Sequence, residues 1–312
     1  MQSKVLVIGE ALIDIVHQND GAIKNIPGGS PANTAVALAR LQIPTFMMAR
    51  TSQDKYGQII RNYLESESVN LEYGVVSSDP SSIIDAYIQT DGSAKYEANL
   101  RGSSDFGWTN VELKFDESKF NFVHLGSLTS YIEPGASSVE NWYKSLRQNN
   151  NLILSFDPNI RHPLDGQKEN DVRERAIRLS KLAHIVKASD EDLKWMANSN
   201  NYLDLVDLFM GNGASLVIVT KGHSGSYLKN KKGFEINMVP AKIEVVDTIG
   251  AGDTFSAAFI AQLIKLNVKN VGDLNELSKD VLTQIMSNCS IASGITCSRQ
   301  GANPPSRSEV NW

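Results

Sequence analysis

The sequence predicts an α/β fold with a mostly parallel central sheet, and two observations carry this prediction. Short apolar runs alternate with segments whose apolar residues recur at helical spacing, as in strand–helix–strand units with helices on both faces of the sheet. The composition, 41% hydrophobic and 21% charged over 312 residues, is that of a globular protein with a sizeable core. The expected strands are 5–8, 45–49, 122–125, 152–156, 184–186 and 216–220. The expected helices are 31–41, 57–65, 137–147, 171–181, 191–197, 202–210, 255–266 and 274–295.

Two regions interrupt this alternation and predict a small accessory sheet. Residues 12–27 show few matches to helical spacing, and residues 73–106 contain strand-like runs with a turn at Asp91-Gly92-Ser93. Asp-Gly between strand-like runs is a strong hairpin signal. The strand-like runs of the second region are 74–76, 83–90 and 95–98. A sheet of this kind over a cleft would act as a lid that excludes water. The alternative is that these strands only extend an edge of the main sheet. We therefore expect one domain over residues 1–312, with these two regions as inserted lid segments.

The bulk properties exclude several classes of function. The net charge is −5 with no block of like charges, so nothing favours nucleic acid or an acidic membrane surface as partner. The apolar runs are too short to span a bilayer, and the N-terminus runs directly into a strand without a signal peptide. Two cysteines, Cys289 and Cys297, lie in an apolar segment and are expected to be reduced. We expect a cytoplasmic protein.

The most informative segment is DTIGAGDTF, residues 247–255. Its turn of Gly250, Ala251 and Gly252 precedes a run of helical spacing, so the turn is expected at a helix N-terminus, where free N–H groups bind phosphate. Asp253 places a carboxylate in the same corner. An acid beside a bound phosphate can take the proton of an attacking hydroxyl. The structural alternative is that Asp253 only contributes a favourable charge or cap to the first turn of the helix.

A second segment, GGSPAN, also combines a flexible turn with a helix start. Gly28 and Gly29 allow close approach to a ligand, Ser30 is expected to cap the helix, and Pro31 suits its first position. Asn33 both donates and accepts hydrogen bonds, which suits a sugar hydroxyl.

Polar residues also follow two expected strands. Asp14 comes after strand 5–8, and SFDPNIR, residues 155–161, ends another strand with Arg161. Ligands of open α/β sheets collect beyond the carboxyl ends of strands. Asp14 could bind two sugar hydroxyls, and the alternative is that it is an ordinary surface acid. Arg161 could pair with a phosphate, and the alternative for its segment is an Asx-Pro turn.

These segments resemble the signatures of the ribokinase-type (phosphofructokinase-B) sugar kinases. DTIGAGD matches their DTxGAGD motif, and GGSPANTAVALARL, residues 28–41, is similar to their first signature, with the Pro-Ala-Asn of the fructokinase branch. The resemblance extends in family order to about residue 305. It implies a ribokinase-like three-layer sandwich with a small β-sheet lid that often mediates a homodimer. It also implies an enzyme that moves the ATP γ-phosphoryl group to a sugar primary hydroxyl, with fructose as the first substrate to expect.

The resemblance assigns the chemical step to the 247–255 segment. Asp253 would accept the hydroxyl proton, the N–H groups of Gly250, Ala251 and Gly252 would stabilise charge on the transferring group, and Mg²⁺ would bridge the phosphates. The helix N-terminus is expected to lower the basicity of Asp253. A loose transition state tolerates a weak base, because the proton can leave late.

The family's sugar site carries over to the residues around Asp14 and the first signature. In relatives an Asp at this position contacts the sugar. DxNxR at Arg161 is similar to the fructokinase and ketodeoxygluconate kinase branch, and Arg101 lies where the family's chain leaves the lid. The substrate-binding residues implied are Asp14, Gly28, Gly29, Asn33, Arg101 and Arg161.

The nucleotide site carries over to two segments with one departure. TKGHSG, residues 220–225, matches the family's T-x-G-x-x-G loop. Where the family has Asn-x-x-Glu, linked to magnesium and phosphate, this chain has Ser189 and Asp192. The acid is thus shortened, the Asn is replaced, and a simple capping box also explains the pair. The nucleotide-binding residues implied are Lys187, Ser189, Thr220, Gly222, Gly225, Gly252 and Asn288.

A potassium site is the last feature that the resemblance implies. TCSRQGA, residues 296–302, is similar to the family's VTRxGA segment. In many relatives, carbonyl oxygens of this segment and the Asp matching Asp247 bind K⁺, a hard cation suited to oxygen ligands. Carbonyl groups leave no side-chain signature, so the sequence leaves this site open.

Several alternatives stay open at this stage. The chain has neither the G-x-x-x-x-G-K-[ST] loop nor a dinucleotide fingerprint after a strand, which argues against a P-loop kinase or a dehydrogenase. A kinase of 2-keto-3-deoxygluconate or of another sugar or nucleoside would share the motifs. A non-catalytic sugar-binding protein is the alternative of another class, and Asp253 argues against it, because a binder needs no base.

Overall fold

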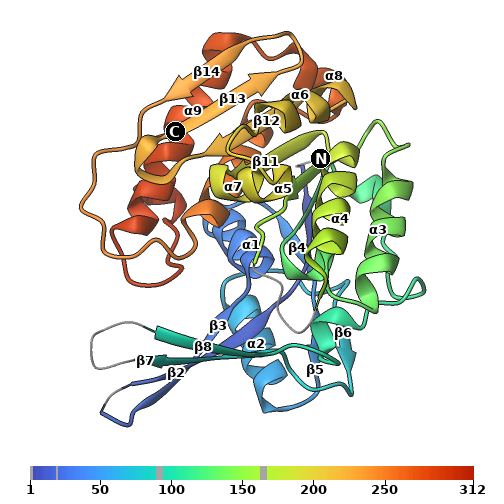
Figure 1. The fold of residues 1–312 in the computed structure, drawn as a ribbon, viewed down its shortest axis with the longest axis vertical. Coiled ribbons are helices and arrows are strands. Elements are labelled where there is room, and N and C mark those ends of the chain that lie inside the picture. The colour runs from blue at the N-terminus through green and yellow to red at the C-terminus, as the bar shows by residue number, and fades with distance from the viewer. Residues whose placement is uncertain (1–2, 19, 89–93, 162–166) are drawn as a thin grey trace.

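The central sheet of the computed structural model, which describes residues 3–18, 20–88, 94–161 and 167–312, has eight strands in the order β14-β13-β12-β11-β10-β9-β1-β4 (Figure 1). These are β1 (Val5–Ile8), β4 (Thr45–Met48), β9 (Phe122–Gly126), β10 (Ile153–Asp157), β11 (Ile185–Ser189), β12 (Leu216–Thr220), β13 (Ser226–Asn230) and β14 (Glu235–Met238). The six expected strands pair in parallel, which confirms the predicted fold class. The antiparallel strands β13 and β14, at one end of the sheet, were not expected.

Helices cover both faces of this sheet, because alternate residues of its buried strands face opposite layers. On β1, Val5 and Val7 pack in one core cluster, whereas Leu6 and Ile8 pack in the other. The first cluster includes residues of α1 (Ser30–Arg40), α2 (Lys55–Ser66), α7 (Ala251–Lys265), α8 (Val271–Glu276) and α9 (Lys279–Cys297). The second includes residues of α3 (Gly135–Leu146), α4 (Glu169–Leu182), α5 (Asp190–Ala197) and α6 (Leu203–Gly211). The result is a three-layer sandwich.

A second, separate sheet projects from this body at the lower left of Figure 1. Its strand order is β3-β2-β7-β8, with β2 and β7 parallel and the outer pairs antiparallel. The strands are β2 (Leu12–His17), β3 (Ile23–Gly28), β7 (Ile83–Ile88) and β8 (Ala94–Asn99). The expected turn at 91–93 lies outside the described residues, as do residues 89 and 90 of the expected strand 83–90.

The strand expected at 74–76 does not join this small sheet, which corrects the sequence prediction. It forms β6 (Val75–Ser77) and pairs in parallel with β5 (Arg50–Ser52) in a sheet of two strands. The N–H of Val75 donates to the carbonyl of Ala49 at 2.9 Å, beside the end of β4. The segment therefore extends an edge of the body before the chain turns into β7.

Two helix predictions also need correction. The run 274–295 is not one helix, because α8 ends at Glu276 and a new N-cap, Ser278, accepts a hydrogen bond from Val281 N–H to begin α9. Ser30 does not cap α1: the N-cap is Gly29, and the Ser30 hydroxyl donates elsewhere. Across the described part of the chain, no helix has the length and apolar character needed to cross a membrane.

Candidate active site

The N-termini of α1 and α7 meet at Asp253. This carboxylate is only 8% exposed and accepts hydrogen bonds from Ser30 Oγ at 2.6 Å and Asn33 Nδ2 at 2.9 Å. Burial raises the pKa of Asp253 above its ordinary value, although hydrogen bonds from Ser30 and Asn33 act in the opposite direction. The lowered basicity expected from the helix N-terminus is therefore not found, since loss of solvation dominates.

The turn before Asp253 presents backbone N–H groups, but fewer than expected. Gly250 has φ 76°, and an added Cβ would lie 2.7 Å from Ala302 Cβ, so this position requires glycine. The N–H of Ala251 donates to the Thr248 carbonyl at 3.3 Å and closes the turn. Among the described residues, the N–H groups of Gly250 and Gly252 have no acceptor. Two of the three predicted donors are thus free to bind an anion.

A buried lysine lies against this turn. An added Cβ at Gly252 would lie 2.8 Å from Lys187 Nζ, so the ammonium group touches the turn that precedes Asp253. Lys187 is 7% exposed, and its Nζ is 2.8 Å from Oδ2 of Asp157, itself 2% exposed. Burial acts to lower the pKa of Lys187, but Asp157 and the carboxylates nearby raise it, so the amine stays charged. Lys187 adds a fixed positive charge to the anion site.

Ser189 and Asp192 form the capping box that the structural alternative predicted. Ser189 Oγ accepts from Asp192 N–H, and Asp192 Oδ2 accepts from Ser189 N–H at 3.1 Å. Asp192 Oδ1 accepts from Ile160 N–H at 2.9 Å. Because both carboxylate oxygens already bind backbone amides, Asp192 is poorly suited to hold magnesium.

The predicted sugar residues Asp14, Gly28 and Gly29 lie together near the ends of β2 and β3. Asp14, on β2, faces the end of β3, where an added Cβ at Gly28 would lie 2.6 Å from Asp14 Oδ2. Gly29 has φ 104°, and its added Cβ would lie 2.5 Å from the Glu10 carbonyl. Burial raises the pKa of Asp14 to about 6, and the nearby charge of Arg161 acts to lower it.

The two arginines of the predicted sugar site are exposed. Arg161 follows β10, and its charge reaches Asp14. Arg101 lies in the turn that follows β8, where the chain leaves the small sheet. The structure thus brings Asp14, Gly28 and Arg161 together and places Arg101 at the junction between the small sheet and the body.

The predicted nucleotide loop lies beside the Lys187 strand. Ser189 at the end of β11 is in register with Thr220 at the end of β12. Gly222 and Gly225 follow with φ 50° and 88°, and an added Cβ at Gly225 would lie 2.0 Å from the Met238 carbonyl. This loop is therefore close to the anion site, at the carboxyl ends of adjacent strands.

Two further predicted residues lie on α9 and in the segment before α7. Asn288 is buried on α9, and its Oδ1 accepts from Gln284 Nε2 at 3.1 Å. Asp247 Oδ2 accepts from Gly301 N–H at 2.8 Å, and Oδ1 accepts from Ile249 N–H. The hydrogen bond from Gly301 joins Asp247 to the 296–302 segment. The described residues contain no group of three His, Cys, Asp or Glu that could hold a metal.

Sequence reasoning missed two side chains that complete this site. Ser30 was expected as a helix cap, but it donates to a carboxylate 223 positions away. Asp157 was interpreted as a turn residue, but it pairs with Lys187. Its position at the end of an apolar strand, the same signal that identified Arg161, could have identified it.

Comparison with known proteins defines the class. A fructokinase of Rhizobium leguminosarum bv. trifolii is 30% identical over 282 residues, 87% of this chain and 84% of the relative. The structure of Xylella fastidiosa fructokinase with bound ATP has a TM-score of 0.87 at 20% identity, covering 97% and 94% of the two chains. A Vibrio cholerae O395 fructokinase bound to fructose, ADP and potassium ion has a TM-score of 0.83 at 20% identity, covering 96% and 94%.

The protein is a carbohydrate kinase. Within that class it belongs to the pfkB family of carbohydrate kinases, and the match to this family covers residues 2–302. The likeness to the solved structures shows that the fold is shared.

Proposed function

We propose that this chain is an ATP-dependent fructokinase that transfers the γ-phosphoryl group to a primary hydroxyl of fructose. The observation that carries the proposal is the buried carboxylate of Asp253, held at 2.6 Å from Ser30 Oγ beside the free N–H groups of the α7 N-terminus. The names of the relatives support fructose, because the 30% identical protein is a fructokinase.

The residues divide the chemical work between them. Asp253 accepts the hydroxyl proton, and its raised pKa makes it a stronger base than an ordinary aspartate. The N–H groups of Gly250 and Gly252, with the ammonium of Lys187, stabilise negative charge on the transferring group. Because the Lys187 charge is already buried, little reorganisation is needed during the reaction.

The sugar and the nucleotide take opposite sides of Asp253. On the sugar side, the Asp14 carboxylate accepts hydrogen bonds from sugar hydroxyls. Asn33 and Gly29 lie there at the start of α1, and the two arginines lie at the rim. On the nucleotide side, ATP phosphates follow Ser189, Thr220, Gly222 and Gly225, and Asn288 borders the base. This arrangement puts the acceptor hydroxyl of the sugar beside Asp253, where it faces the γ-phosphoryl group of ATP.

Magnesium fits the site best at Asp157. Its Oδ1 is buried and has no hydrogen-bond partner among the described residues, and carboxylate oxygen is the ligand that Mg²⁺ prefers. When bound, the ion neutralises phosphate charge. Potassium would take carbonyl oxygens of 296–302 near Asp247, and the potassium ion bound by the Vibrio cholerae fructokinase supports this part of the proposal.

The proposal also includes a cytoplasmic location and a homodimer. Cys289 and Cys297 are both free thiols, which suits the reducing cytoplasm. Ile23 and Ile26 expose 61% and 46% of their surface on edge strand β3, and a homodimer through the small sheet would cover them. Light scattering of the protein and of Ile23→Glu tests the dimer: a monomer in the unchanged protein would contradict it.

The function itself is tested by ADP release from Mg-ATP with single sugars. Fructose should support turnover, and ketodeoxygluconate, ribose, tagatose and adenosine should support little. Turnover on another member of this panel would support the mechanism but contradict the assignment of fructose as the substrate. Thermal stabilisation by fructose without any ADP release would support a binding protein instead.

A further inference from the structure

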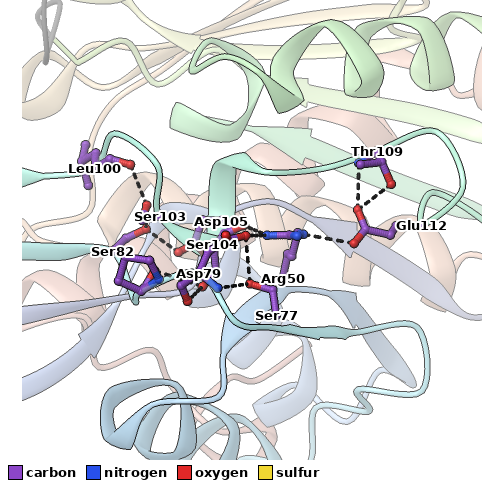
Figure 2. Close-up of polar contacts among 11 residues, drawn as sticks. Arg50, Ser77, Asp79, Ser82, Leu100, Ser103, Ser104, Asp105, Thr109 and Glu112 are labelled. Carbon is purple, nitrogen blue, oxygen red and sulfur yellow. Dashed lines mark hydrogen bonds and ion pairs between the residues drawn. The ribbon is translucent and has the colours of Figure 1, made fainter.

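Four chain segments connect the body to the small sheet, and two buried acids, Glu10 and Asp105, lie among them. The crossings are residues 9–11, 29, 78–82 and 100–103. Asp105 follows the last crossing and is 1% exposed. Figure 2 shows it close to Ser82, Ser103 and Ser104, with the separate polar contacts of Arg50 beside them.

Asp105 contacts two of these crossings directly. Its Oδ1 accepts the N–H of Ala11 at 2.7 Å, one residue before β2 begins. Its Oδ2 lies 2.5 Å from Ser82 Oγ, one residue before β7 begins. Because β2 and β7 are the paired central strands of the small sheet, one carboxyl group holds the entry points of both.

The hydroxyl contacts that continue from Ser82 determine where the protons are. Ser82 Oγ lies 2.6 Å from Ser103 Oγ, which lies 2.6 Å from the Leu100 carbonyl oxygen (Figure 2). A carbonyl oxygen only accepts, so Ser103 donates to Leu100. Its single proton is then used, and Ser82 must donate to Ser103. The Ser82 proton is also used, so the proton in the contact with Asp105 has to come from the carboxyl group.

We propose that Asp105 is a neutral carboxylic acid that donates to Ser82 and accepts from Ala11, and is thereby the positioning residue that holds β2 and its Asp14 in place for the sugar. The part of this proposal that concerns the sugar rests on the proposed function. The protonation of Asp105 does not.

The surroundings support a neutral group. Burial raises the pKa of Asp105 to about 7, and the neighbouring Glu10 acts in the same direction. Glu10 is itself buried, and desolvation raises its pKa although its carboxylate accepts from Thr129 N–H and Oγ1. Two buried acids side by side favour the uncharged state of at least one of them.

The neighbouring cation, Arg50, is already balanced by other carboxylates. Arg50 Nη1 donates to the Ser104 carbonyl at 3.0 Å and lies 2.7 Å from Asp79 Oδ2. Arg50 Nε lies 3.2 Å from Glu112 Oε1 (Figure 2). The two carboxylates therefore take the charge of Arg50, and Asp105 receives no direct ion pair from it among the described contacts.

The pH dependence of stability follows with a definite sign. An unfolded aspartate has a pKa of about 3.9, whereas Asp105 in the folded chain has a pKa of about 7. The stabilising contribution of the protonated group is fully present below the unfolded value and is lost as the pH rises through the folded value. Asparagine at 105 would offer the same carbonyl acceptor and an N–H donor without titrating.

The experiment compares the thermal midpoints of the unchanged protein and Asp105→Asn at about pH 5 and pH 8.5. Because the unfolded aspartate is already ionised at pH 5, the Asn variant should have the higher midpoint at both pH values. Its advantage should grow by several degrees between pH 5 and pH 8.5, where Asp105 ionises in the folded chain. Other titrating groups cancel in this difference. An Asn variant that is destabilised at pH 5 would overturn the proposal, because an ionised acceptor cannot be replaced by an amide donor.

The positioning role has its own readout. Asp105→Leu should raise the fructose KM by about 10-fold or more, as displacement of binding groups does, and leave the ATP KM nearly unchanged, while Asp105→Asn should retain both values. An equal rise of both KM values, or loss of fructose binding in the Asn variant, would overturn it. If fructose is not a substrate, the thermal comparison still decides the protonation of Asp105, so the two failures are distinguishable.

Discussion

The phosphate side of the site and the sugar side differ in how their charges are held. On the phosphate side, Asp253, Lys187 and Asp157 are all buried and contact protein partners. On the sugar side, Asp14 is half-buried, and Arg161 lies exposed at the rim. Groups that stabilise a transition state are most effective when they are held rigidly in a dry site. Groups that select a sugar can lie on exposed segments, where substitution alters specificity without disturbing the body.

The largest effect on stability is expected from Lys187→Met. Removing one partner of a buried ion pair leaves Asp157 without compensation and should cost about 3–5 kcal/mol. Urea denaturation measures this loss. Lys194→Met is the matched control, because Lys194 pairs with Asp190 at a more exposed position and should cost under about 0.5 kcal/mol. Equal small losses in both variants would contradict the picture of a rigid phosphate side.

The turn before Asp253 provides the second test. Gly250→Ala combines a positive φ with an added Cβ only 2.7 Å from Ala302 Cβ, and should cost about 1–3 kcal/mol. Gly233→Ala separates the two causes, because Gly233 has φ 84° with open space around it. Its smaller loss in the same denaturation experiment would measure backbone strain alone. Tolerance of Ala at 250 would show that the turn can move.

On the sugar side, the effect should appear in binding as a function of pH. The pKa of Asp14 is raised to about 6 by burial, so only about one tenth of it is ionised at pH 5. If the carboxylate accepts sugar hydroxyls, the fructose KM should rise roughly 10-fold between pH 8 and pH 5. Asp14→Asn should bind weakly and without this dependence. A flat KM profile in the unchanged protein would remove Asp14 from the sugar site.

The smallest effect is expected from Arg161→Gln. The charge of Arg161 lowers the pKa of Asp14, so its removal should move the KM profile toward higher pH and raise the fructose KM at pH 7 by up to about twofold. Arg178→Gln, on α4 and paired with Glu140, is the surface control. An unchanged profile in Arg161→Gln would mean that the two side chains are not coupled in solution.

The sequence predicted the body well because fully buried parallel strands read as continuous apolar runs, as in β1 and β12. It missed β13 and β14 at the antiparallel end of the sheet, because both are short and polar residues interrupt their apolar positions. It placed Asp253 at a helix N-terminus from local spacing alone. It could not predict that Ser30 donates to Asp253, or that Lys187 touches Gly252, because these contacts join segments far apart in the chain. Burial, which reverses the expected basicity of Asp253, is likewise a tertiary property.

The most direct test of the central claim is the turnover of Asp253→Asn with Mg-ATP and fructose, measured together with ATP affinity. Asp280→Asn is the control, since Asp280 is an exposed acid in the first turn of α9. We predict that Asp253→Asn loses at least about 100-fold in kcat and keeps ATP binding, as removal of a general base does, while Asp280→Asn stays active. Near-native turnover of Asp253→Asn would contradict the assignment of the base.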